Sequence, residues 1–235
     1  MNLEALSKQY ATDGVVKVER LFSPAQIEEI RAQLKRYAEE ITPGLPPNDV
    51  VFEADGVSVR NCWRMEHHDP WFAELAKSET VLAMVADFVH GAPALMAVES
   101  FNKPARVGSA VPPHQDNAYF CLTPPDALTV WIAVDAVTEA NGPVSYLLGS
   151  QIEGARPHKV SGVAGNSMGL AECPDQSAAW PGLLEPGDAL VHHCNTIHFS
   201  APNTSEFARR GLLMVFKGAH CAVDEGLRAG YALAT

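Results

Sequence analysis

The spacing of apolar positions changes near residue 95. Upstream, apolar residues recur three and four positions apart, which is the period of an amphipathic helix. Downstream, short runs rich in valine, isoleucine and leucine are separated by proline, glycine and asparagine, as is typical of strands and turns. The chain therefore predicts a helix-rich layer over residues 1–94 and a β-rich core over residues 95–235.

Two helices are predicted in the first part. Ser23-Pro24-Ala25-Gln26 marks the start of one, because Ser23 can cap it, Pro24 suits the first helical position and Gln26 completes a capping box. Its apolar face is formed by Ile27, Ile30, Leu34 and Tyr37, and Pro43-Gly44 ends it. The second is predicted as one helical segment from about Pro70 to Phe88.

A strand is expected at Val15–Val18, directly after the turn signal Asp13-Gly14. Five more β-rich runs follow the change in spacing: Ala97–Phe101, Leu128–Val134, Val144–Leu148, Ala189–His193 and Leu212–Lys217. Short strands at such intervals favour a sandwich or barrel over a parallel sheet. We expect one mainly-β domain, in which N-terminal helices pack against a double-stranded β-helix (jelly-roll) core.

Charge and composition narrow the class of protein. The chain has 17 basic and 28 acidic residues among 235, a formal net charge of -11. Binding to nucleic acid or to an anionic membrane favours the opposite sign. Hydrophobic residues make up 47% of the chain, enough for a sizeable core, and the apolar region Val81–Val98 is interrupted by Asp87 and His90, so no membrane span is predicted. A small-molecule substrate is the expected partner of a monomer or homodimer.

The cysteines and the N-terminal residues indicate a compartment. The five cysteines are an odd number, are widely spaced and include no C-x-x-C pair, which favours reduced thiols over a disulfide framework. Residues 1–10 contain Glu4 and Lys8 and no apolar run, so no signal peptide is predicted. We expect a cytoplasmic protein.

The sharpest chemical motif is His114-Gln115-Asp116, which follows two prolines. Two side chains separated by one residue lie on the same face of an extended strand, so both can converge on one point. An imidazole and a carboxylate are two thirds of the 2-His-1-carboxylate triad that binds Fe(II) and leaves coordination positions open. The pair alone is a weak signal, because His-X-Asp also occurs by chance.

A second motif follows the β-rich run that ends at His193. His198 stands at a turn, Ser200 comes two residues later, and Arg209 stands eleven residues past His198 on the next β-rich run. Arginine is suited to hold a carboxylate through two parallel hydrogen bonds. A buried arginine without a nearby acidic partner is otherwise costly. The second motif therefore strengthens the interpretation of the first.

Together these motifs resemble the phytanoyl-CoA dioxygenase family of 2-oxoglutarate-dependent oxygenases. The resemblance covers nearly the whole chain and includes further matching segments: Asp13-Gly14-Val15-Val16, Ser23-Pro24, Asn102-Lys103-Pro104, Trp131-Ile132-Ala133-Val134, Glu139-Ala140-Asn141-Gly142-Pro143, Leu148-Gly149-Ser150, Gly187-Asp188 and Asn203. It implies that His114, Asp116 and His198 bind Fe(II), and that Arg209 with Ser200 binds the distal carboxylate of 2-oxoglutarate.

The sequence departs from the family pattern at two positions. Pro113 stands where the family commonly has tryptophan, and Gln151 stands where it often has histidine. Neither is a ligand position, so the implied iron site is unaffected. The departures suggest an individual substrate pocket.

The resemblance implies an enzyme that consumes 2-oxoglutarate and O2, releases succinate and CO2, and oxidises a C–H bond of a small polar metabolite or natural-product intermediate. Hydroxylation or a related oxidation is expected rather than halogenation, because halogenases of this fold replace the carboxylate ligand with a small residue and Asp116 is present. A metal-dependent isomerase or hydrolase on the same fold would not predict the pair Ser200 and Arg209. A non-catalytic binding relative should have lost ligands, and none is lost.

Several residues near these motifs have both a chemical and a structural interpretation. Thr129 and Trp131 share one face of a strand and either line the 2-oxoglutarate pocket or pack in the core. Lys103 either approaches 2-oxoglutarate or the substrate, or is a solvated charge. The candidates for substrate binding are Arg64, His67, Asn117 and Tyr119. The upstream cations expected near the mouth are Arg60, Arg64 and Lys103.

The remaining histidines leave alternatives open. His192 and His193 compete with His198 for the third ligand position; they point to opposite faces of a strand, and His193 is expected to pack or hydrogen-bond beneath the site. The others, His67-His68 and His220, are interpreted as surface or pocket-rim residues. Arg210 is expected to face outward as a surface charge, and Cys194 beside His193 gives a weak indication of zinc.

Overall fold

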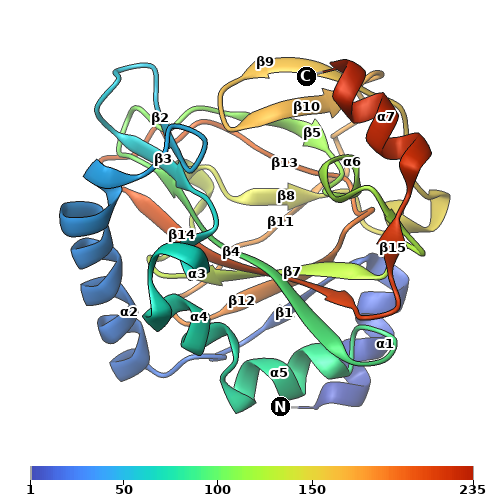
Figure 1. Cartoon of the computed structure of the whole chain (residues 1–235), viewed down its shortest axis with the longest axis horizontal. Helices are drawn as coiled ribbons and strands as arrows, with labels where there is room; N and C mark the ends of the chain where they lie inside the picture. Colours follow the sequence, from blue (N-terminus) through green and yellow to red (C-terminus); the bar gives the residue numbers. More distant parts are fainter. Residues whose placement is uncertain (1, 235) are drawn as a thin grey trace.

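Two facing antiparallel sheets form the centre of the computed structural model, which describes residues 2–234 (Figure 1). The seven strands of the large sheet, in spatial order, are β1 (Val15–Val18), β12 (Ala189–His193), β7 (Ala127–Ala133), β14 (Arg209–Gly218), β4 (Pro93–Lys103), β3 (Val59–Cys62) and β2 (Val50–Phe52). The four strands of the small sheet are β11 (Trp180–Pro181), β8 (Val144–Tyr146), β13 (His198–Ser200) and β5 (Val111–His114). Two further pairs are β9 (His158–Val163) with β10 (Asn166–Leu170), and β6 (Leu122–Thr123) with β15 (Ala222–Val223).

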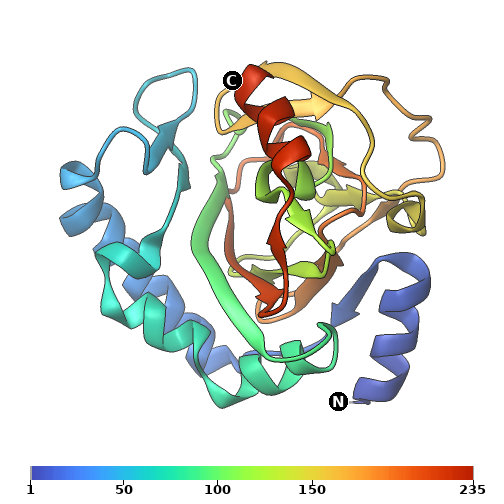
Figure 2. The same cartoon turned by 45° about the vertical axis from the view of Figure 1, so that its right-hand side comes forward.

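Helices cover the outer face of the large sheet, as Figure 2 shows for the blue and teal segments. The α-helices are α1 (Leu3–Asp13), α2 (Pro24–Arg36), α3 (Met65–His68), α4 (Pro70–Ala76), α5 (Glu79–Ala86), α6 (Asn117–Phe120) and α7 (Glu225–Ala234). Side chains of α2, α4 and α5, including Ile27, Phe72 and Val81, share one core with outward-facing residues of the sheet. Val130 of β7 and Met214 of β14 are two of these sheet residues. Among the described residues, no helix has both the length and the apolar character needed to span a bilayer.

The central strands separate an apolar side from a polar one. Every residue of β7 is buried, and its outward-facing Val130 and Ile132 join the helix-packed core. Its inward-facing Thr129 and Trp131 face the space between the two sheets, where Trp131 packs in a smaller core with Tyr146 of β8. The polar residues of the candidate site face this inner side of the large sheet.

The mainly-β jelly roll with N-terminal helices is confirmed, and so is the capping box at Ser23 and Gln26. The helical segment predicted over 70–88 is two helices, because Ser78 has an extended backbone (ψ 143°) and begins α5 anew. The N-terminal part also contributes strands: β1 pairs with β12 at one edge of the large sheet, while β2 and β3 extend the other. We did not predict α1, β2, β3 or the β9–β10 hairpin.

Candidate metal centre

His114 and His198 are direct neighbours across the small sheet. His114 ends β5 and is paired in register with His198, the first residue of β13. β5 lies at the edge of its sheet, and its pairing with β13 is irregular between Val111 and His114, so Pro112 and Pro113 are tolerated there without interrupting a regular ladder of hydrogen bonds. The two imidazole rings lie 4.2 Å apart between centroids.

Asp116 reaches the two histidines from a turn. Its backbone (φ -61°, ψ -31°) is helical and opens α6, because the strand has already ended at His114. Its Oδ1 lies 3.7 Å from His114 Nε2 and 3.5 Å from His198 Nε2. The expectation that the two side chains share one face of a strand is wrong, since the helical turn brings the carboxylate back toward His114. Ligand atoms of the three residues lie within 4.8 Å of one another.

The backbone fixes which nitrogen of each histidine is available. Nδ1 of His114 lies 2.9 Å from the carbonyl oxygen of Pro112, and Nδ1 of His198 lies 3.0 Å from that of Thr196. A carbonyl oxygen can only accept, so Nδ1–H donates and Nε2 keeps its lone pair toward Asp116. Burial lowers the pKa of His114, and it lowers that of His198 to about 3. Both rings are therefore neutral at pH 7, the form that binds a metal ion.

The second oxygen of Asp116 is held by two donors. Oδ2 accepts hydrogen bonds from the Thr129 hydroxyl (2.9 Å) and from His192 Nε2 (3.1 Å), while His192 Nδ1 lies 3.1 Å from the Tyr146 hydroxyl. Burial by itself raises the pKa of Asp116, yet His198, His192 and His114 together bring it below its ordinary value. Asp116 is therefore ionised and oriented, with Oδ1 left for a metal.

The side chain of His192 contacts the metal site, whereas that of His193 points away from it. On β12, His192 faces inward to Asp116, whereas His193 packs near Tyr10 of α1, with ring centroids 6.1 Å apart. The prediction that His193 supports the site is wrong. The strand is apolar on both faces, at Ala189, Leu190 and Val191, so the sequence offered no alternation that would fix its phase.

A cavity of about 530 Å³ opens beside the three ligand residues. Arg209, at the start of β14, lies in its wall and is only 1% exposed. Its Nη1 donates to the carbonyl oxygen of Gly142 (2.8 Å), its Nε is buried without a partner, and no acidic side chain among the described residues pairs with it. Its guanidinium lies 4.9 Å from the centroid of the Trp131 ring. Burial lowers the pKa of Arg209 to about 9, so it remains charged at pH 7.

Of the four other residues proposed for 2-oxoglutarate, all but Lys103 lie in the cavity wall. Ser200, Thr129 and Trp131 all line the same cavity as Arg209. Thr129 contacts Asp116 as well, a role that its position on a predicted strand did not indicate.

Lys103 is not at the cavity. It pairs across strands with Arg209, and its buried amine donates to the carbonyl oxygens of Ser109 and Ala201. Burial lowers the pKa of Lys103 to about 6, with the neighbouring charges of Arg209 and Arg60 acting in the same direction. These contacts give no support to the prediction that Lys103 approaches 2-oxoglutarate.

The candidate substrate residues divide into two groups. Arg64 and Tyr119 line the cavity; Arg64 is ion-paired with Asp49. The Tyr119 hydroxyl is hydrogen-bonded to both backbone groups of Met168 (3.0 Å each). His67 and Asn117 lie outside the cavity lining, which gives no support to their prediction as substrate residues.

The residues outside the lining have contacts of their own. The His67 side chain is 66% exposed beside Glu66. The Asn117 side chain is buried and bonds both backbone groups of Leu122, which closes the turn after α6. Arg60, expected near the mouth, is instead buried in an ion pair with Glu53.

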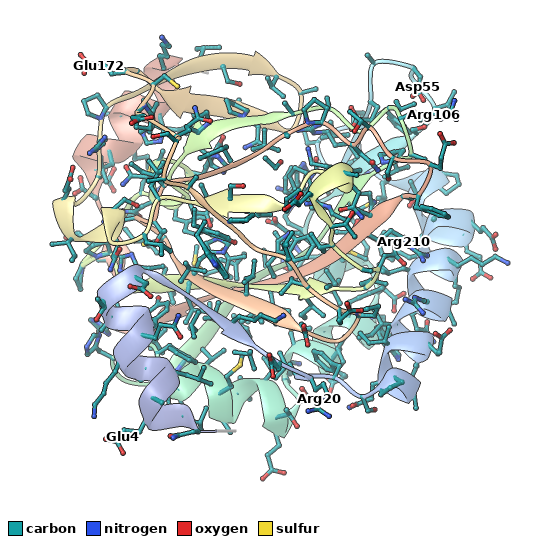
Figure 3. All side chains as sticks on the ribbon, turned by 180° about the vertical axis from the view of Figure 1, so that it is seen from behind. Glu4, Arg20, Asp55, Arg106, Glu172 and Arg210 are labelled. Atoms are coloured by element: carbon teal, nitrogen blue, oxygen red, sulfur yellow. The ribbon has the colours of Figure 1, made fainter. Side chains whose placement is uncertain are left out.

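Three further expectations concern residues outside the cavity lining, namely Arg210, Cys194 and His220. The Arg210 side chain (labelled in Figure 3) is 37% exposed, but it forms a two-pronged ion pair with Asp135 rather than a free surface charge. The thiol of Cys194 donates to the carbonyl oxygen of Pro125, and Cys194 belongs to no group of metal-capable side chains among the described residues. His220 does belong to one, with Asp126 and Cys221.

A jelly roll that places two histidines and a carboxylate beside a buried, unpaired arginine is the arrangement of the non-haem iron, 2-oxoglutarate-dependent oxygenases. The family described as phytanoyl-CoA dioxygenase (PhyH) matches residues 10–211. The chain belongs to the PhyH family. It is a 2-oxoglutarate-dependent dioxygenase, and its cofactors are Fe(II), 2-oxoglutarate and O2.

Two curated relatives match over most of their length. A probable alpha-ketoglutarate-dependent hypophosphite dioxygenase of Stutzerimonas stutzeri is 25% identical over 225 residues, covering 90% of this chain and 77% of the relative. The L-proline trans-4-hydroxylase of Streptomyces griseoviridis is 26% identical over 236 residues, covering 88% and 84%.

Solved structures share the fold at lower identity. The carbocyclase SnoK from nogalamycin biosynthesis superposes with a TM-score of 0.77 at 18% identity, covering 99% of this chain and 90% of SnoK. EctD from S. alaskensis, solved with 2-oxoglutarate and 5-hydroxyectoine, gives 0.75 at 17% identity, covering 90% and 74%.

Proposed function

We propose that His114, Asp116 and His198 bind one Fe(II), that Arg209 and Ser200 bind the distal carboxylate of 2-oxoglutarate, and that the enzyme hydroxylates a C–H bond of a small polar metabolite or natural-product intermediate. The observation that carries this proposal is the presence, in the wall of one cavity, of three convergent ligand side chains and a buried, unpaired arginine. The cavity of about 530 Å³ falls within the usual range for small-molecule sites, about 300–1,000 Å³.

Two imidazoles and a carboxylate suit Fe(II), and neighbouring groups hold these three ligands in position. Bound Fe(II) supplies the activation of O2 and the oxidative decarboxylation of 2-oxoglutarate to succinate and CO2. His114 and His198 present neutral imidazoles whose Nδ1 protons are held by the backbone. Thr129 and His192 fix Asp116 so that one oxygen is available. Such supporting hydrogen bonds orient ligands and tune their basicity.

Arg209 neutralises the distal carboxylate of 2-oxoglutarate at a buried position in the cavity wall. A carboxylate buried without a partner would cost several kcal/mol. The Ser200 hydroxyl makes no hydrogen bond among the described residues, and Arg209 gives only Nη1 to the carbonyl oxygen of Gly142, so this hydroxyl and the other guanidinium N–H groups are the donors that remain for it. A jelly-roll isomerase or hydrolase would require neither.

Hydroxylation is proposed over other outcomes on two grounds. The retained Asp116 speaks against halogenation, which needs that coordination position for a halide. The similarity to an enzyme named as a proline hydroxylase supports oxygen insertion. Enzymes of the same fold include an epimerase and a carbocyclase, so the product is the discriminating observation.

The test is a substrate screen by 2-oxoglutarate-dependent succinate release, followed by mass analysis of the product in excess chloride. We expect the product mass to rise by one oxygen atom and the activity to be lost in His198→Ala. A chlorinated product, or a product of unchanged mass, would contradict the hydroxylase proposal. Succinate-free turnover that still needs the metal would favour the isomerase or hydrolase alternative.

A further inference from the structure

Glu99 presents a carboxyl group to the cavity from the middle of β4. Its strand neighbours Val98 and Ser100 are buried on the other face, while Glu99 and Phe101 line the cavity. Glu99 is paired in register with Leu213 of β14, another lining residue. The carboxyl group is therefore part of the cavity wall, on the same strand pair that carries Arg209.

This carboxyl group has no partner within the protein. No hydrogen bond or ion pair joins it to any described residue. Burial raises the pKa of Glu99 to about 8, and the negative charges of Asp116 and Glu66 act in the same direction, against Arg64. A carboxyl group in this position lowers the stability of the folded protein unless a bound molecule pairs with it, because its ionised form is partly desolvated and has no opposite charge beside it.

The cations of the cavity are already engaged. Arg64 is ion-paired with Asp49, which also contacts His68. Arg209 is the residue proposed for 2-oxoglutarate. Asn166 adds another acceptor, since its buried Oδ1 has no partner and the residue lines the cavity. With 2-oxoglutarate on Arg209 and Arg64 paired with Asp49, the carboxyl group of Glu99 would have no cationic partner of its own, and a substrate that brings a donor would supply one.

We propose that Glu99 recognises a protonated nitrogen of the substrate, so that the substrate class is small amines or related cations rather than carboxylates, phosphates or CoA thioesters. The inference rests on the proposed function, since it assumes that Arg209 is occupied by 2-oxoglutarate. The ring of Trp63, which lines the cavity, is compatible with a cationic group because ring faces attract cations.

The test uses matched pairs of probes that differ only at one atom. Benzylamine is compared with benzyl alcohol, and piperidine with tetrahydropyran, each titrated calorimetrically into anaerobic protein saturated with Fe(II) and 2-oxoglutarate. We expect each amine to bind at least about tenfold more tightly than its neutral counterpart. Glu99→Gln keeps the shape of the side chain but cannot ionise to pair with an ammonium group, so it should abolish the preference.

Glu172→Gln is the matched control, because it makes the same change of charge at an exposed residue away from the cavity, at the top of Figure 3. It should keep the preference of the parent. Equal or undetectable binding of amine and neutral probe by the parent, or an unchanged preference in Glu99→Gln, would overturn the inference.

The same samples separate this inference from the proposed function. Titration of 2-oxoglutarate alone should give equal affinity in the parent and in Glu99→Gln, since Glu99 is assigned to the substrate. If 2-oxoglutarate binds both proteins but the amines show no preference, only the role of Glu99 fails. If 2-oxoglutarate does not bind the Fe(II)-loaded parent, the proposed function fails.

Discussion

The described residues include two groups of side chains with ligand atoms close enough to share a metal ion, and these groups differ in exposure and in the contacts of their carboxylates. One is His114, Asp116 and His198; the other is Asp126 with His220 and Cys221. In the first group, side-chain exposure does not exceed 14%. In the second, the His220 side chain is 45% exposed.

The contacts of the two carboxylates explain the difference. Asp116 has one oxygen fixed by Thr129 and His192, and the other faces the two ligand histidines. Asp126 accepts a hydrogen bond from the backbone N–H of His90 (2.8 Å), which joins the residue before β7 to the segment between α5 and β4. Asp116 also borders the cavity that contains Arg209, whereas Asp126 does not. Proximity of ligand atoms is therefore a weaker criterion than an oriented carboxylate beside a cavity.

The largest effect is expected from removing a ligand of the first group. His198→Ala should abolish Fe(II) binding, because two ligands remain of three. His193→Ala, on the same segment but directed toward Tyr10, should leave the stoichiometry near one iron per chain. Metal analysis after anaerobic Fe(II) loading and desalting measures both. If His193→Ala loses the iron and His198→Ala keeps it, the ligand assignment is wrong.

Arg209 is predicted to act on the co-substrate without acting on the metal. Arg209→Ala should keep Fe(II) and weaken 2-oxoglutarate binding by about 2–5 kcal/mol, the usual penalty for removing one partner of a buried charge pair. Arg210→Ala is the matched control, since Arg210 pairs with Asp135 on the other face of β14. Calorimetry on anaerobic Fe(II)-loaded protein measures the difference. Equal 2-oxoglutarate affinity in Arg209→Ala and the parent would show that the co-substrate is held elsewhere.

The hydrogen bond to Asp116 should have a smaller effect. Thr129→Val removes the hydroxyl donor to Oδ2 at nearly constant volume and leaves His192 in place. Loss of such a supporting contact typically costs about 10–100-fold in metal affinity. Competition for Fe(II) with a chelator of known affinity would report it. An unchanged affinity would mean that His192 alone orients the carboxylate.

The second group should give the smallest effect. Asp126→Asn should leave both the iron stoichiometry and 2-oxoglutarate affinity unchanged. It should lower the free energy of unfolding by about 0.5–1.5 kcal/mol through weaker bonding to the N–H of His90. Urea denaturation and metal analysis check the two statements separately. A second bound iron in the parent that disappears in Asp126→Asn would remove the distinction between the groups.

The sequence was most informative where spacing and residue type together limit the choices. His114, Asp116, His198 and Arg209 were predicted as one site, and the structure brings them to one cavity. The turn at Asp116 was not foreseen, because two residues separated by one suit either a strand or a strand followed by a turn.

Other features depend on contacts that no local pattern encodes. The inward direction of His192 was not foreseeable on a strand buried on both faces. Lys103 has the strand parity of Glu99 and Phe101, yet its amine is drawn to the carbonyl oxygens of Ser109 and Ala201. Glu99 itself gave no signal, since a single acidic residue in a strand is ordinarily solvated. These side chains are placed by tertiary packing rather than by periodicity.

The most direct test is a crystal structure of the protein grown anaerobically with Fe(II) and 2-oxoglutarate, with anomalous data at the iron edge. We predict one iron peak between His114 Nε2, Asp116 Oδ1 and His198 Nε2, and density for 2-oxoglutarate with its distal carboxylate on Arg209. An iron peak at Asp126, His220 and Cys221 instead, or 2-oxoglutarate density that does not reach Arg209, would contradict the account.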